Sequence, residues 1–329
     1  MEQVCEKTLN LFNVGCLVSL KIGTWSGRKM LTRKDMVEMG INPDSLPDDI
    51  VNLGRKLLVP KDELAKITKI EQKARKYLTK WSVPFGLANS HFVPIKKVQE
   101  VETVLSDLRI EFNDLIDSFI ARFAEIKDKI RQEHGDFWDK CLRQYYPASP
   151  DKLKARFYFD WHLFKIAGMD AIQETDVNEL LANEELKDEK VNEIRNTMQQ
   201  EVQKFVQEYV STMRNETIEF CNLVDARVNG TLYKGETEPK KLTARSLSYF
   251  KGYVDKFKTM NIFGDDQIQK LLTDLQSEFL FSEAVPKDLD DNHVKNSLSQ
   301  ALSSIRKAAQ DQGEKTSQFM NSLKRKIVI

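Results

Sequence analysis

Cysteine and histidine are both scarce in this chain, with four of each among 329 residues. The cysteines are scattered without a CxxC spacing, and no histidine has a second histidine or a cysteine at the separation that metal ligands need. We therefore expect neither a disulfide framework nor a metal site, and we expect reduced thiols in a cytoplasmic protein. The cysteines are Cys5, Cys16, Cys141 and Cys221, and the histidines are His91, His134, His162 and His293.

Long apolar runs and a charge imbalance are also absent. No stretch approaches about 18 consecutive apolar residues, and the start of the chain carries Glu2 and Glu6 without a basic n-region. We therefore expect neither a membrane-spanning helix nor a secretory leader. Lys and Arg together number 50, as do Asp and Glu, so the net charge is zero. This balance gives no general attraction to nucleic acid or membranes, although it is compatible with a local patch.

The motifs of common enzyme and nucleotide sites are missing as well. No GxGxxG, HExxH, GxSxG or EF-hand spacing occurs. The segment 23–30, Gly-Thr-Trp-Ser-Gly-Arg-Lys-Met, has some likeness to a phosphate-binding loop. Its glycines are separated by three residues instead of four, Arg28 precedes Lys29, and Met30 stands where a hydroxyl would bind magnesium. The sequence therefore predicts no enzyme and no cofactor.

Long helical periodicity is what the sequence has instead. Residues 177–229 read as one amphipathic helix, because apolar residues recur every eleven positions, at roughly 3.67 residues per turn. A helix of this length would span about 80 Å, so it needs a partner along its length. The recurring residues are Val191, Val202, Met213 and Val224 in one row and Met198, Tyr209 and Phe220 in another.

A second amphipathic segment, residues 95–134, is the nearest candidate partner. Its apolar residues follow in steps of three and four and make three heptads with the coiled-coil spacing of about 3.5. We expect the two segments to form long antiparallel helices as coiled-coil-like arms. Because two such arms expose more apolar seam than one chain of this length covers, we also expect a homo-oligomer. The heptad residues are Val98, Val101, Leu105, Leu108, Phe112, Leu115 and Phe119.

Alternating apolar residues predict strands at three places. The first is Val14–Ile22, the second is 51–59, where Val51, Leu53, Leu57 and Val59 share a face opposite Lys56, and the third is the aromatic run 157–166. Pro84 and Gly86 break the helical pattern that precedes them, and residues 87–94 read as a loop. The fold class is therefore mostly α with a small α+β head, in which the strands form a three-stranded antiparallel sheet.

The resulting domain organisation has five parts. Residues 1–94 form the α+β head, 95–134 the first arm, 135–176 the return to the head with the third strand, and 177–230 the second arm. After a polar linker, residues 241–329 carry three helical patterns and end in a frayed basic tail.

One group of residues stands out as a candidate binding site. If the first two strands are neighbours, the turn after the first strand and the second strand bring an aromatic ring and several cations together. Such a patch could bind a carboxylate-rich protein or a phosphate backbone. In the alternative interpretation, Trp25 fills the edge of the core and the cations are solvated. The candidate residues are Trp25, Ser26, Gly27, Arg28, Lys29, Arg55 and Lys56.

The strand leading into 23–29, the segment 47–60 with its core Leu-Gly-Arg-Lys-Leu, and the strand 156–166 together resemble a family of uncharacterised bacterial and phage proteins. Members are often encoded beside a MoxR-type AAA+ ATPase and a von Willebrand factor A-domain protein. The resemblance covers roughly residues 10–230 and carries no catalytic residues. It implies a cytoplasmic helical protein that works with an ATP-driven ring as adaptor, substrate or scaffold.

The expected function is therefore that of a non-enzymatic interaction protein, an adaptor or scaffold for a MoxR-type AAA+ ATPase. The alternative is a nucleic-acid-binding protein that uses the basic and aromatic residues of the head.

Overall fold

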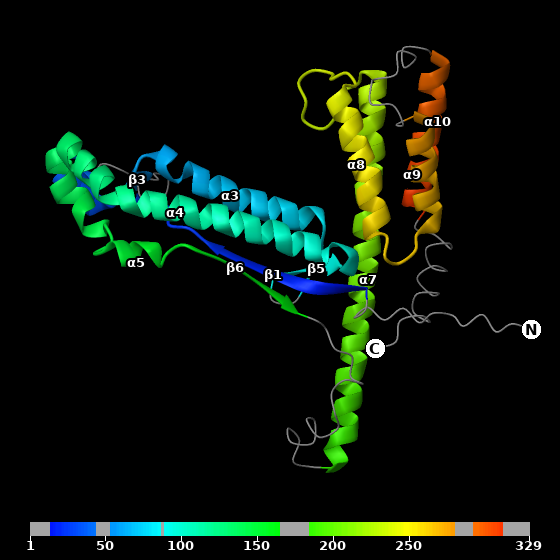
Figure 1. Ribbon diagram of the computed structural model, residues 1–329, viewed down its shortest axis with the longest axis horizontal. Coiled ribbons are helices and arrows are strands. Elements are labelled where there is room, and N and C mark those ends of the chain that lie inside the picture. The colour runs from blue at the N-terminus through cyan, green and yellow to red at the C-terminus, as the bar shows by residue number, and fades with distance from the viewer. Residues whose placement is uncertain (1–13, 44–52, 87–88, 165–183, 280–291, 312–329) are drawn as a thin grey trace, which may run out of the picture. The chain divides into compact units, whose positions relative to one another are not determined.

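The computed structural model describes residues 14–43, 53–86, 89–164, 184–279 and 292–311. Figure 1 shows that helices make up most of this structure. Among the described residues, no helix has the length and apolar character that crossing a membrane requires.

The chain divides into two compact units. The first comprises Met1–Val18, Trp81–Gln99 and Leu163–Ile329, and the second comprises Ser19–Lys80 and Glu100–His162.

The main sheet has four strands in the order β4-β5-β1-β6, not the predicted three. Strand β1 (Gly15–Gly23) pairs antiparallel with β5 (Ser90–Pro94), which pairs antiparallel with β4 (Val83–Phe85). Most of the expected loop at 87–94 is thus the strand β5, and the segment around Pro84 is its partner strand β4. Proline is tolerated in an edge strand, where its missing N–H costs no ladder hydrogen bond, and Pro84 lies in the edge strand β4.

The two other predicted strands exist, but only one joins this sheet. The aromatic run forms β6 (Tyr158–Phe164), the neighbour of β1, as expected. The second predicted strand is the short β3 (Arg55–Leu57), which pairs with β2 (Arg28–Met30) in a separate two-stranded antiparallel ribbon. The turn between β1 and β2 redirects the chain away from the main sheet.

In the second unit, α3 (Lys61–Lys80) and most of α4 (Ile95–Phe137) lie side by side (Figure 1). Polar contacts join the two helices. The residue numbers of these contacts rise along α3 as they fall along α4, so the pair is antiparallel. The contacts are Glu63 to Arg122 at 3.1 Å, Lys73 to Glu111 at 3.8 Å and Tyr77 to Glu100 at 2.6 Å.

The apolar stripe of α4 is buried within this unit. Phe112 packs against Phe159 of β6 with ring centroids 5.5 Å apart, and Val101 and Leu105 are buried too. The partner of the first long segment is therefore α3 together with the sheet, and not the second long segment as predicted. The stripe had indicated that a partner exists, but it carried no information about which one.

Short elements complete the second unit. Helix α2 (Arg33–Glu38) begins with a capping box between Thr32 and Asp35, and α5 (Pro150–Lys154) follows Ser149 as its N-cap. The chain between α4 and α5 forms a π-helical turn, Trp138–Leu142, and a 3₁₀ turn, Arg143–Tyr145.

The first unit is built on the second long helix, α7 (Glu184–Asn229), which packs with α8 (Ala244–Met260), α9 (Asp266–Phe279) and α10 (Asn292–Gln310). The eleven-residue rows are buried at the members whose side chains are described: Tyr209, Met213, Phe220 and Val224. The described residues do not show the coiled-coil-like arms that the sequence predicted.

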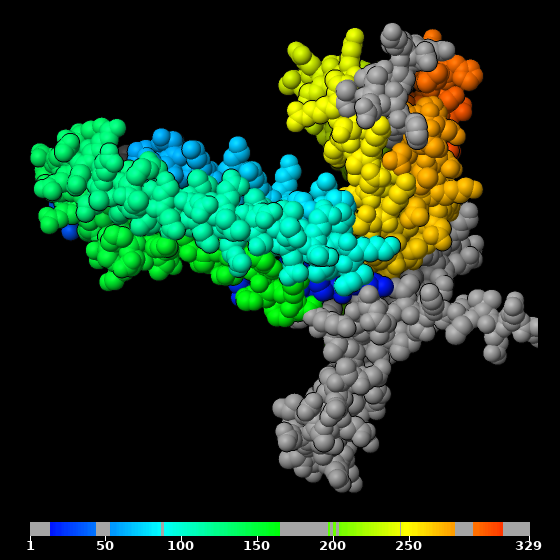
Figure 2. Space-filling model, in the orientation of Figure 1, coloured from blue at the N-terminus to red at the C-terminus, as the bar shows by residue number. Residues whose placement is uncertain are grey.

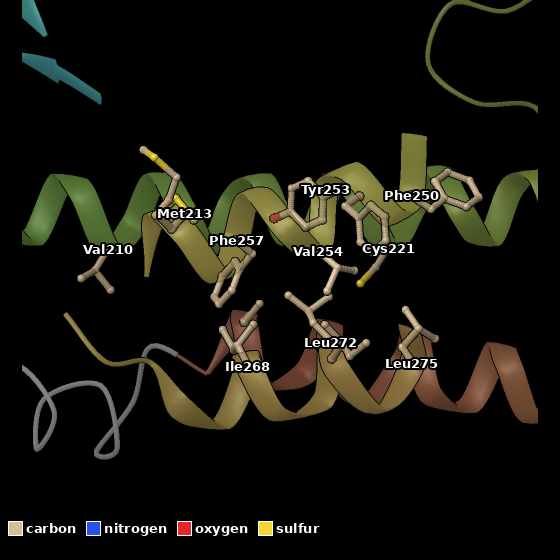
Figure 3. Close-up of a cluster of buried hydrophobic side chains, with 14 of the residues drawn as sticks. Val210, Met213, Cys221, Phe250, Tyr253, Val254, Phe257, Ile268, Leu272 and Leu275 are labelled. Carbon is tan, nitrogen blue, oxygen red and sulfur yellow. The ribbon is translucent and has the colours of Figure 1, made fainter. Parts of the chain in front are cut away.

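Facing helices of the first unit interlock through large apolar side chains. Figure 3 shows Val254 and Phe257 of α8 turned toward Ile268 and Leu272 of α9. Residues 165–176 of the predicted return to the head, 177–183 of the predicted second arm, 280–291, and the basic tail within 312–329 lie outside the described residues.

Candidate functional site

The ribbon of β2 and β3 has two different faces, and its register assigns each residue to one of them. Arg28 lies opposite Leu57, Lys29 opposite Lys56, and Met30 opposite Arg55. Directly opposed residues share a face and consecutive residues alternate, so one face carries two arginines and two apolar residues. These four residues are Arg28, Met30, Arg55 and Leu57, and we call them the outer ribbon face.

Every side chain of the outer ribbon face is exposed. Met30 is 50% exposed and Leu57 37% exposed, although both are large and apolar. Within the described residues, neither Arg28 nor Arg55 takes part in an ion pair, and the face contains no carboxylate. This part of the ribbon thus presents two uncompensated positive charges beside two apolar side chains.

The opposite face of the ribbon is anchored to α2 through Lys56, whereas Lys29 on the same face is exposed. Lys56 is 5% exposed, and its Nζ lies 2.6 Å from both carboxylate oxygens of Asp35 and 4.1 Å from the ring centroid of Tyr145. The sequence analysis grouped Lys56 with Arg28 and put Leu57 on the apolar face. That grouping is wrong, since the ion pair buries Lys56 and leaves Leu57 outside.

Asp35 is held in its charged form by this arrangement. Burial on its own raises the pKa of Asp35, but hydrogen bonds from Lys56 and Thr32 outweigh it, and the pKa lies below its ordinary value. The N–H and Oγ1 of Thr32 both donate to Asp35 at 2.7 Å.

Trp25 belongs to the core of the second unit. It is 6% exposed, and its ring lies 6.3 Å from that of Phe119 and 5.8 Å from that of Phe123, the latter edge-on. Of the two interpretations left open by the sequence, the structure places this side chain in the core, where little of its surface is exposed.

Gly27 lets the turn lie directly on the start of α3. Its φ is +60°, and a Cβ at this position would lie 2.8 Å from Val59 Cγ2 and 3.0 Å from Leu64 Cδ1. The Leu58 N–H donates to the Gly27 carbonyl at 2.7 Å, and the Tyr146 hydroxyl donates to the Leu58 carbonyl. Only glycine combines this φ with so close an approach.

A cavity of about 660 Å³ opens between this turn and α3. Arg28, Lys61 and Lys69 line it, and within the described part of the chain none of them forms an ion pair and none of the lining residues is acidic. Figure 2 shows the N-terminal half of α3 (light blue) at the surface of this unit. The other polar lining residues include Thr24, Ser26 and Thr68, and the apolar ones include Trp25, Val59 and Leu64.

Lys61 and Lys69 were missed in the sequence analysis. They stand eight residues apart on α3, which places them within about 80° of one another around the helix. The signal that could have found them is this spacing of basic residues on the polar side of the helix.

Among the described residues no group of three or more His, Cys, Asp or Glu side chains could hold a metal ion. Burial raises the pKa of the Cys221 thiol to about 12, and burial followed by the nearby Asp35 carboxylate raises that of Cys141. Both thiols are therefore poor nucleophiles at neutral pH.

The fold and this site define a mostly helical protein with a small antiparallel sheet and a basic, partly apolar surface on its second unit. The chain belongs to the family described as "Protein of unknown function (DUF3150)", which matches residues 13–288. No curated protein and no solved structure matches it.

Proposed function

We propose that this protein is a non-enzymatic adaptor whose outer ribbon face binds an acidic, partly apolar segment of a partner protein. The observation that carries the proposal is the composition of that face: Arg28 and Arg55 without ion pairs in the described structure, beside exposed Met30 and Leu57. Arginine and methionine are enriched at protein interfaces, and exposed charges of one sign steer a partner of the opposite sign.

The partner that the family resemblance suggests is a MoxR-type AAA+ ATPase, which acts with a von Willebrand factor A-domain protein. An adaptor that binds one nucleotide state of the ring more tightly than another shifts the ring toward that state. The proposal therefore includes a dependence of the complex on the nucleotide bound to the ATPase.

Self-association through the long helices remains a prediction on which the adaptor role does not depend. Within the described residues, the apolar stripes of α4 and α7 are buried inside their own units. These buried stripes therefore give less support for a homo-oligomer than the sequence pattern did.

Nucleic-acid binding is the second candidate, and the unpaired cations favour it as far as charge is concerned. We prefer a protein partner for two reasons: Trp25 is only 6% exposed and offers little area on which bases could stack, and Met30 and Leu57 expose apolar area that a phosphate backbone does not match.

The test is size-exclusion chromatography with light scattering of the full chain, alone and mixed with the neighbouring ATPase, with and without ATP. The proposal predicts a complex whose amount differs between the two nucleotide conditions. If no complex forms and the protein binds DNA or RNA with an affinity that falls steeply with salt, the nucleic-acid function replaces the adaptor function.

A further inference from the structure

The cavity between the Thr24–Gly27 turn and α3 is a separate feature from the outer ribbon face. The two share Arg28 and Leu57, but Lys61 and Lys69 belong only to the cavity, and Met30 and Arg55 only to the ribbon. Its volume of about 660 Å³ lies within the range of about 300–1,000 Å³ that is typical of small-molecule sites.

The lining of the cavity favours a negatively charged ligand. Three cations from two elements surround it: Arg28 from β2, and Lys61 and Lys69 from α3. Acidic residues stand close by in the sequence, yet none lines the cavity, and Glu63 instead pairs with Arg122 of α4 at 3.1 Å. A positive charge concentrated in this way attracts a multiply charged anion more strongly than a singly charged one.

The apolar and hydroxyl side chains of the lining set two further requirements for a ligand. Val59, Leu64 and the buried Trp25 supply apolar contact, while the hydroxyls of Thr24 and Ser26 supply polar groups at the rim. Gly27 sets this shape, because any larger residue would displace the turn from Val59 and Leu64. The site is therefore built for a ligand that has a doubly charged anionic head and a small apolar body.

We propose that this cavity binds a small molecule carrying a phosphomonoester, with the phosphate between Arg28, Lys61 and Lys69 and its apolar part on Val59 and Leu64. A phosphomonoester carries nearly two negative charges at neutral pH and offers three acceptor oxygens, which matches three cationic donors. The proposal is independent of the adaptor function.

The test uses the full chain, with phenyl phosphate as the probe. Benzoate is the matched probe, because it has the same ring and a single negative charge. Binding is followed by the ¹H–¹⁵N signals of the tryptophan indoles and of the Ser26 and Gly27 amides. Trp25 reports on the cavity, whereas Trp138 and Trp161 of the same unit do not line it and are internal controls.

We expect phenyl phosphate to shift the Trp25, Ser26 and Gly27 signals saturably and to bind about tenfold or more tightly than benzoate. The double variant Lys61→Gln, Lys69→Gln weakens this binding by about tenfold or more, because two charge-assisted contacts are lost. Both lysines are exposed, so the variant keeps the fold. The control is Arg131→Gln, which removes an exposed arginine of α4 that does not line the cavity and leaves the affinity unchanged.

Three results would each overturn the proposal: no saturable shift, equal affinity for benzoate, or full affinity in the double lysine variant. A further variant, Met30→Ala with Arg55→Ala, separates the two hypotheses. It alters only the outer ribbon face, so it weakens partner binding and leaves phenyl phosphate binding within about threefold.

Discussion

Replacing Lys56 by Met tests the central structural contact of the ribbon. Its Nζ lies 2.6 Å from both oxygens of Asp35, and the two side chains are 2% and 3% exposed. Methionine keeps the length of the side chain but removes the ammonium group, which leaves a buried carboxylate without its counter-charge. Breaking a buried pair in this way costs about 3–5 kcal/mol. Because Thr32 still donates to Asp35, we expect about 3 kcal/mol.

The measurement is native-state hydrogen exchange of the amides in α2 and β3, because it reports the stability of the structure around each amide separately. Lys29→Met is the matched control, because Lys29 is exposed and lies 5.9 Å from the same Tyr145 ring; we expect a change within about 0.5 kcal/mol. The double variant Lys56→Met, Asp35→Asn removes both charges and should recover at least about 1 kcal/mol relative to Lys56→Met. A loss below about 1 kcal/mol for Lys56→Met would refute this reasoning.

The remaining predictions concern pH, the turn and the core of the first unit. The pKa of Asp35 in the folded protein lies below its ordinary value of about 3.9, so its carboxylate stabilises the fold fully above that pH. This stabilisation is lost as the pH falls through the folded pKa. The free energy of unfolding measured against pH should show the loss in the wild type and less of it in Lys56→Met. Gly27→Ala should destabilise the second unit by roughly 2 kcal/mol or more in urea unfolding, because Gly27 has a φ of +60° and the new Cβ would lie 2.8 Å from Val59 Cγ2. A urea unfolding curve that matches the wild type would contradict this. Thr217 donates to the Met213 carbonyl, so the buried Tyr253 hydroxyl 2.8 Å away donates to Thr217. Thr217→Val should cost about 1–3 kcal/mol because it leaves the Tyr253 hydroxyl without this partner, whereas Tyr253→Phe should cost less because Thr217 keeps its bond to Met213. Equal losses in the two variants would argue against this direction of the hydrogen bonds.

The periodic elements were predictable from the sequence because their patterns are local. The eleven-residue rows of α7 indicated a helix with one buried stripe, and Tyr209 and Phe220 are buried accordingly. The Ser149-Pro150 start of α5 and the aromatic strand β6 also follow from residues that are adjacent in the chain.

The pairing of these elements was not predictable, because it depends on contacts that no local pattern encodes. An apolar stripe such as that of α4 looks the same whether it faces α3 or another helix. Pro84 suppressed the prediction of β4, since a proline is compatible with a strand only at an edge, and the edge is known only once the strand order is known.

The candidate site was partly predictable for the same reason. The turn 25–29 and the strand with Arg55 and Lys56 do come together in one ribbon. Which residues share a face depends on a register that one sequence does not contain, and the burial of Lys56 depends on Asp35, which is 21 residues away along the chain.

The outer ribbon face is tested most directly by measuring how tightly charge-reversal variants bind the MoxR-type ATPase. We expect Arg28→Glu with Arg55→Glu to weaken the complex at least about tenfold, since both attractions become repulsions, and Arg131→Glu to have no effect. Equal affinities of the two variants would contradict this expectation, because the arginines of the ribbon would then contribute no more than a surface charge elsewhere on the same unit.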